Sequence, residues 1–125
     1  MNLVDSSAWL EYFADGPNAG FFAPAIERAR DLLVPTIVVF EVYKRVLQQR
    51  NERAALEAIS VLQHGLLIEL TASLAIAAAQ ISQHEKLPMA DSIILATARV
   101  QNATIWTQDS DFEEMDRVKY RAVKR

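Results

Sequence analysis

Acidic side chains stand at the ends of apolar segments in several parts of this sequence. Near the C-terminus the chain reads TIWTQDSDF (residues 104–112), in which an apolar run meets Asp109 and Asp111. The N-terminal run NLV likewise ends at Asp5. Such a carboxylate has two interpretations, because it can cap the helix that follows or hold a positively charged group.

Two further carboxyl groups stand beside apolar residues, where a merely solvated role is less favourable. Glu41 lies between Phe40 and Val42, and Asp91 precedes the apolar segment SIILATA. Two unit charges 4 Å apart repel by about 4 kcal/mol at an effective dielectric of about 20, so clustered carboxylates must take up protons or bind cations. Oxygen ligands without histidine or cysteine suit Mg²⁺ or Mn²⁺. The chemistry that such a site supports is phosphodiester hydrolysis by a metal-activated water.

The elements that must position these groups alternate between short apolar strands and longer segments of helical spacing. Strands are expected at Leu3-Val4, 32–34, 66–70, 104–107 and 118–122. Helices are expected after a cap at Ser6 or Ser7, over about 23–29, 37–50 and 53–63 with Gly65 as C-cap, after Thr71, and over 90–101. This alternation predicts an α/β fold of three layers, with a central, mainly parallel sheet covered on both faces.

This topology brings the acidic residues to one edge of the sheet. In a right-handed strand–helix–strand unit the helix runs antiparallel to the strands, so helix N-termini and strand C-termini share an edge. Asp5, Asp109 and Asp111 follow strands, whereas Glu41 and Asp91 lie early in helices. We therefore expect all five to converge where open α/β sheets bind ligands.

Composition limits the other possibilities. The 125 residues suit one domain, 1–125, and the net charge of −3 means that affinity for nucleic acid would depend on local basic patches or bound cations. The absence of cysteine and the presence of only two histidines disfavour a disulfide framework, a zinc site and a Ser-His-Asp triad. The N-terminus lacks the basic region of a signal peptide, and no apolar stretch is long enough to span a bilayer. We expect a cytoplasmic protein without a membrane partner.

Each acidic residue also has an ordinary structural interpretation. Asp5 fits a turn, Glu41 can pair with Arg45, and Asp91 is favourable against the dipole of its helix. The alternative function is therefore a non-catalytic α/β interaction module whose carboxylates only cap helices. A phosphoacceptor signalling domain is disfavoured, because the first strand offers one acid and Thr71-Ala72 follows the third.

Several polar and basic residues near these acids have two interpretations as well. Ser110 and Glu113 form a capping-box pattern, and Thr107 and Ser6 are expected either to bond to backbone groups or to support a metal ligand. Five of the thirteen basic residues lie between Arg117 and Arg125. A second basic group consists of Lys44, Arg45, Arg50 and Arg53. Either group is a solvated face or a rim that binds phosphates.

Four segments in order resemble the PIN domain family, specifically its VapC-type ribonuclease toxins. They are VDSSAWLEYF, PTIVVFEVYKRVL, LPMADSIILATA and TIWTQDSDF, and the resemblance covers essentially the full chain. It implies a five-stranded sheet of order 3-2-1-4-5. It also implies an endoribonuclease that uses Mg²⁺ or Mn²⁺, forms a homodimer and is inhibited by a small VapB-like antitoxin.

The same resemblance implies the roles of individual residues. Asp5, Glu41, Asp91 and Asp109 match the acidic quartet that is catalytic and holds the metal, and Asp111 is a fifth metal ligand that relatives use variably. We therefore expect a metal-dependent ribonuclease acting on RNA. Its cleavage should not need the 2′-hydroxyl as nucleophile, because no histidine pair stands ready to deprotonate it.

Overall fold

The computed structural model describes residues 1–124, in which strands and helices alternate much as predicted. The strands are β1 (Asn2–Val4), β2 (Leu32–Pro35), β3 (Leu66–Ile68), β4 (Thr104–Thr107) and β5 (Val118–Tyr120). The helices are α1 (Ser6–Phe13), α2 (Ala19–Glu27), α3 (Thr36–Gln49), α4 (Glu52–Leu62), α5 (Ala72–Glu85) and α6 (Met89–Gln101). Short 3-10 turns occupy Ala29–Asp31 and Ser110–Phe112.

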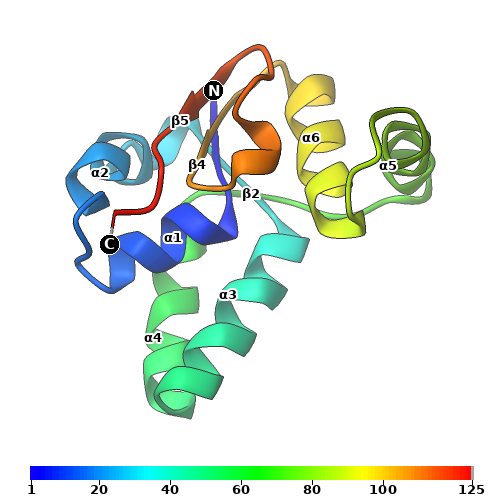
Figure 1. The fold of residues 1–125 in the computed structure, drawn as a ribbon. Helices are drawn as coiled ribbons and strands as arrows, with labels where there is room; N and C mark the ends of the chain where they lie inside the picture. Colours follow the sequence, from blue (N-terminus) through cyan, green and yellow to red (C-terminus); the bar gives the residue numbers. More distant parts are fainter. Residues whose placement is uncertain (125) are drawn as a thin grey trace.

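The five strands form one parallel sheet in the order β3-β2-β1-β4-β5, which confirms the predicted order. The chain moves in one direction from β1 to β3 and then reverses to reach β4. Because such crossovers are right-handed, α1 to α4 and the pair α5 and α6 lie on opposite faces of the sheet (Figure 1). The reversal places the switch point between β1 and β4.

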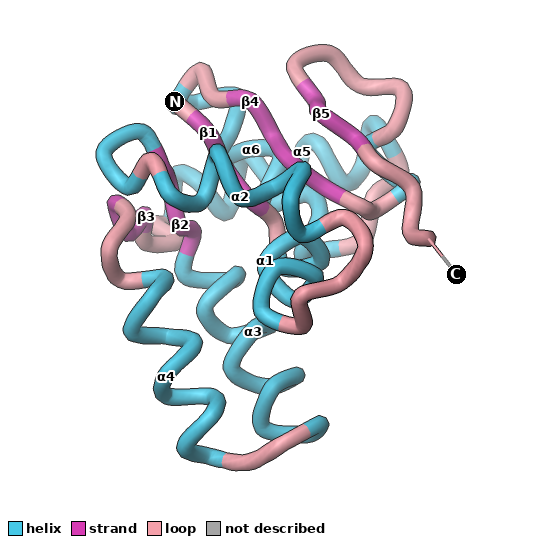
Figure 2. The backbone as a smooth tube through the Cα atoms, turned by 90° about the vertical axis from the view of Figure 1, so that its left-hand side faces the viewer, coloured by secondary structure: helices cyan, strands magenta, loops and turns pink. Residues whose placement is uncertain are grey.

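The main core covers both faces of the sheet, because it includes buried residues of α1 to α4 and of α6. Leu3, Leu33 and Ile105 from the three central strands are fully or almost fully buried. Trp9 on α1 is also buried and stacks on Phe13, with ring centroids 5.6 Å apart. Trp9 is therefore a core residue. The hairpin of α3 and α4 extends beyond the sheet (Figure 2).

Two predicted helix starts are wrong. Asp5 rather than Ser6 or Ser7 caps α1, because its side chain accepts the backbone N–H of Ala8. Helix α2 begins at Ala19 instead of about residue 23, directly after the Gly-Pro break. Its start is fixed by Glu11, whose Oε2 accepts the backbone N–H of Asn18 at 2.7 Å.

The prediction that Gly65 is the C-cap of α4 is also wrong. The helix ends at Leu62 and its C-cap is Gln63 in a right-handed conformation. A Cβ atom on Gly65 would lie 2.9 Å from the carbonyl oxygen of Leu32 and from Val34. Glycine is required here because β3 must approach β2 closely.

Within residues 1–124, no helix is long and apolar enough to cross a bilayer.

Candidate active site

The acidic residues predicted from the sequence lie around the C-terminal edge of the sheet. Asp5 directly follows β1, whereas Asp109 and Asp111 lie in the segment after β4. Asp91 lies in the first turn of α6, and Glu41 lies in the second turn of α3. The topology therefore delivers these residues to the switch point.

Three of these residues form a compact cluster. One carboxylate oxygen from each of Asp91, Asp109 and Asp111 lies within 4.8 Å of the others. This spacing allows the three oxygens to share one cation.

Asp109 also acts on Asp5 and Glu41, the two acidic residues outside the cluster. Its negative charge raises the pKa of Asp5 and of Glu41 as well as that of Asp91, although burial is the largest cause in each case. Glu41 Oε1 also accepts a hydrogen bond of 3.0 Å from Ser6 Oγ, which opposes the rise in its pKa. The structure thus clusters Asp91, Asp109 and Asp111, and it places Asp5 and Glu41 close enough to Asp109 for its charge to act on both.

Asp5 is the most deeply buried member of the group, with 2% of its surface exposed. Its Oδ1 accepts hydrogen bonds from Ser7 Oγ at 2.7 Å and from the backbone N–H of Ala8 at 3.0 Å. Its Oδ2 accepts a bond of 2.5 Å from Thr107 Oγ1. Burial raises the pKa of Asp5 to about 6 against the opposing effect of these three donors.

Asp91 shows the strongest effect of crowding. Burial, followed by contact with Asp111 and Asp109, raises the pKa of Asp91 to about 8. Without a cation, the cluster therefore retains a proton at neutral pH.

Thr107 has a larger role than the sequence indicates. It is fully buried, donates to Asp5 and accepts the backbone N–H of Asp109 at 2.8 Å. The side chain of Asp109 in turn accepts the backbone N–H of Asp111 at 2.9 Å. Asp109, not Ser110, therefore caps the 3-10 turn, and Thr107 ties this cap to the end of β1.

A further polar network holds the loop that carries Asp109. The buried Asn18 side chain donates through Nδ2 to Gln108 Oε1 at 2.6 Å and to the carbonyl oxygen of Ala122 at 2.9 Å. The backbone N–H of Gln108 donates to Ser7 Oγ at 3.0 Å. Sequence reasoning missed Asn18 and Gln108, because no local pattern indicates a contact across 90 residues.

Among residues 1–124, no basic side chain forms an ion pair with the acidic group. The ion pairs within residues 1–124 are Arg53 with Glu57 and Arg99 with Glu85. The pair of Glu41 with Arg45, which was one ordinary interpretation, does not form among them. An all-oxygen group with excess negative charge has the donor chemistry of a site for a hard divalent cation.

Comparison with known proteins identifies the family. A family model described as PIN domain matches residues 3–118. The chain belongs to the PIN domain family. A search of curated protein sequences found no significant match.

Solved structures share the fold of this PIN domain at low sequence identity. A toxin-antitoxin complex from Klebsiella pneumoniae is 22% identical with a TM-score of 0.79, covering 95% of this chain and 96% of the other. VapC20 from Mycobacterium tuberculosis, a Sarcin-Ricin loop cleaving toxin, is 18% identical with a TM-score of 0.79 and coverages of 94% and 97%. DNA-bound VapBC from Salmonella typhimurium is 12% identical with a TM-score of 0.72 and coverages of 97% and 96%.

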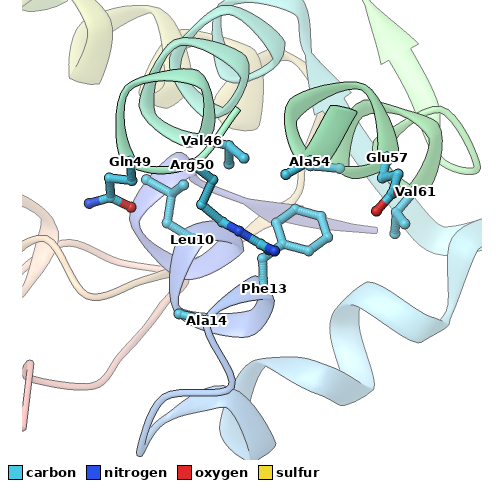
Figure 3. A pocket seen from close by; sticks show the side chains of 10 residues that line it. Leu10, Phe13, Ala14, Val46, Gln49, Arg50, Ala54, Glu57 and Val61 are labelled. Carbon is cyan, nitrogen blue, oxygen red and sulfur yellow. The ribbon is translucent and has the colours of Figure 1, made fainter. Parts of the chain in front are cut away.

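A separate groove lies away from the acidic group of this PIN domain. Figure 3 shows Leu10 and Phe13 of α1 facing Val46 of α3 and Val61 of α4, with Arg50 crossing between them. The hollow has a volume of about 330 Å³ and a mostly apolar lining. Its chemistry suits an apolar side chain rather than a cation.

Proposed function

We propose that this PIN domain is a divalent-metal-dependent endoribonuclease whose active site is the acidic group at the switch point. The observation that carries the proposal is the cluster of Asp91, Asp109 and Asp111, near enough to Asp5 and Glu41 for charge effects, with no ion pair to any of the five within residues 1–124. Family membership and the similarity to a toxin that cleaves an RNA loop support RNA as the substrate.

Asp91, Asp109 and Asp111 would hold the cation, which we propose to be Mg²⁺ or Mn²⁺, with Asp5 and Glu41 completing the ligand and catalytic set. A divalent cation bound there polarises a phosphate oxygen and makes water a better nucleophile at neutral pH. Two observations support a cation at these three residues. Their oxygens are close enough to share one ion, and without an ion Asp91 retains a proton because its pKa is raised.

The protein's own groups then have distinct tasks. Asp91 gives up its proton when the site is filled, so cation affinity depends on pH. Asp5 and Thr107 hold Asp109 in place through the bonds described above. Glu41, whose raised pKa makes it a better proton acceptor than an ordinary carboxylate, is suited to take a proton from the attacking water.

The proposed reaction is hydrolysis rather than transesterification. A bond forms between the water oxygen and phosphorus, the bond from phosphorus to one ribose oxygen breaks, and that oxygen leaves with a proton. The products are a hydroxyl end and a phosphate monoester. An RNA with a 2′-deoxy sugar at the cleaved position should therefore still be cut, and a 2′,3′-cyclic phosphate product would contradict this mechanism.

The decisive experiment is an RNA-cleavage assay with Mn²⁺ or with EDTA. The wild type should cleave only with the cation, whereas Asp5→Asn should be inactive under both conditions. Asp116→Asn is the matched control, because Asp116 is an exposed carboxylate outside the acidic group. Cleavage that persists in EDTA would overturn the proposal.

We also propose that the protein is a cytoplasmic toxin held inactive by a small VapB-like antitoxin. The similarity to solved toxin-antitoxin complexes supports this partner. The groove lined by Leu10, Phe13, Val46 and Val61 is our candidate site for an apolar helix of the antitoxin, which would dock in the helix-in-groove mode.

The alternative, a non-catalytic interaction module, rests on one specific observation: Asp5 and Asp109 both cap helical turns. It predicts that Mn²⁺ does not raise the melting temperature. Metal binding should raise the melting temperature of a nuclease of this design, because the folded state binds the cation and the unfolded chain does not.

A further inference from the structure

Two basic side chains form cation–π contacts with aromatic rings at the edge of the sheet that carries β5. Lys119 Nζ lies 4.8 Å from the ring centre of Trp106, and Arg121 Cζ lies 4.3 Å from that of Phe21. The two rings are 5.4 Å apart. Lys119, Trp106, Phe21 and Arg121 thus form one continuous row, which we call the cation–aromatic row.

The row is built by strand geometry. Lys119 pairs in register with Trp106, and the backbone N–H of Arg121 donates to the carbonyl oxygen of Thr107. Side chains two residues apart on a strand share a face, so Lys119 and Arg121 both point toward the side that α2 covers. Figure 1 shows β5 next to α2. This face of β5 and of the residue that follows it therefore carries both cations.

The charges of the row are available to a ligand. Lys119 and Arg121 are exposed, and neither takes part in an ion pair within residues 1–124. The rings hold the cations in place without neutralising them, since a cation–π contact leaves the full charge. Trp106 is itself fixed, because its Nε1 donates to Asn2 Oδ1 at 2.9 Å.

The row leads toward the acidic group. The strands are parallel, so β5 ends at the same edge as β4. Arg121 directly follows β5 and is the residue of the row nearest that edge. Asn18 bonds both to Gln108, the neighbour of Asp109, and to Ala122, the neighbour of Arg121. The end of the row and the loop that carries Asp109 are therefore joined by one side chain.

We propose that the cation–aromatic row binds single-stranded RNA, with Lys119 and Arg121 contacting successive phosphates on one side of the cleaved bond. The inference rests on the proposed function and adds the path of the substrate. Two residues along a strand span about 6.7 Å, which is comparable to the separation of neighbouring phosphates in an extended chain. The exposed side of the Arg121 guanidinium also offers a flat surface on which a base can stack. An acidic protein needs such a local basic track to hold RNA.

The test compares Lys119→Gln, Arg121→Gln and the double variant with wild type in two assays. The first measures the affinity for a short fluorescein-labelled single-stranded RNA in EDTA at several salt concentrations. The second measures cleavage of the same RNA with Mn²⁺. The control is Arg99→Gln, which removes an equal charge from α6 on the opposite face of the sheet together with its ion pair to Glu85.

Each contact between a cation and a single-strand phosphate contributes about 0.7 to the slope of log affinity against log salt concentration. Relative to about 1 M salt, one such contact is therefore worth about fivefold in affinity at about 0.1 M salt, and each substitution should weaken RNA binding by about that factor. The double variant should lose about 25-fold, and its salt dependence should be shallower by about 1.4. In the cleavage assay KM should rise while kcat is unchanged, and Arg99→Gln should behave as wild type. Lys119→Arg, which keeps the charge, should retain affinity.

The outcomes separate the two proposals. If the double variant cleaves normally with unchanged affinity and KM, the proposal that the row binds RNA is wrong, but the nuclease proposal stands. If the wild type does not cleave RNA but its RNA binding depends on the row, the nuclease proposal is wrong and the proposal about the row is supported. Absence of both cleavage and row-dependent binding would overturn both.

Discussion

At the scale of single residues, Asp91 is the carboxyl group whose ionisation is most strongly disfavoured, by burial and by its neighbours in the site. Its carboxyl group lies beside Asp109 and Asp111, and its pKa is about 8. Asp91→Asn should therefore abolish Mn²⁺-dependent cleavage, with a loss of more than about 100-fold, since weaker changes around metal ligands already cost 10- to 100-fold. The same variant should melt at a higher temperature than wild type in EDTA at pH 8, because the amide carries no charge.

The control for this prediction is Asp116→Asn, which removes an exposed carboxylate and should change neither property. A circular dichroism spectrum identical to that of wild type would show that Asp91→Asn folds. Retained cleavage in a folded Asp91→Asn protein would contradict the assignment of Asp91.

The raised pKa of Asp91 also fixes the sign of a pH effect. Between its usual 3.8 and about 8, the unfolded chain loses this proton while the folded protein keeps it. The folded state then binds more protons, so its free energy of unfolding decreases as pH rises through this window. In EDTA, the melting temperature of wild type relative to Asp91→Asn should fall with rising pH, and Mn²⁺ should reduce the fall. If the difference in melting temperature between wild type and Asp91→Asn does not change with pH, the pKa of Asp91 is not raised.

At the scale of elements, Thr107 couples the ends of β1 and β4. Thr107→Val keeps the shape of the side chain but leaves Asp5 Oδ2 and the N–H of Asp109 without their partner. We expect a loss of about 1–3 kcal/mol in the free energy of unfolding and a 10- to 100-fold loss of activity. Thr107→Ser should restore both, because it keeps the hydroxyl.

Thr97→Val is the matched control for Thr107. Thr97 is equally buried, but its hydroxyl donates to the carbonyl oxygen of Ile93 within α6. Its loss should leave activity near that of wild type. Equal losses of activity in both valine variants would mean that Thr107 acts only through general stability, which chemical denaturation would measure alongside cleavage.

The elements also show which features can be read from the sequence. Short apolar runs between helical segments predicted the sheet, because burial on both faces of a parallel strand leaves a clear hydrophobic run. Cap positions were less predictable. Asp5, Ser6 and Ser7 are all good N-caps, and the one that caps α1, Asp5, is also bonded to Thr107, which is 102 residues away.

The candidate site divides in the same way. Its carboxylates could be found, since topology alone sends strand ends and helix starts to one edge. The polar residues that hold them could not. Asn18, Gln108 and Ser7 become neighbours only through tertiary contacts, and nothing in their local sequences marks them.

At the scale of the whole molecule, an exposed apolar hollow is lined by residues of α5 and α6. Leu70 is 43% exposed, Met89 is 72% exposed, and both line a space of about 410 Å³ with small residues of α5. Met89 is two residues from Asp91. We propose that a second copy covers this hollow, forming the homodimer that the family resemblance implies.

Met89→Glu should convert such a dimer to a monomer in sedimentation velocity at micromolar concentrations, because a buried unpaired charge strongly disfavours an interface. Val100→Glu is the control: Val100 is 66% exposed but lies near the C-terminal end of α6, outside the lining of this hollow. A wild type that sediments as a monomer, or a Met89→Glu protein that remains a dimer, would contradict this interface. RNA cleavage by Met89→Glu would then measure whether the monomer is active.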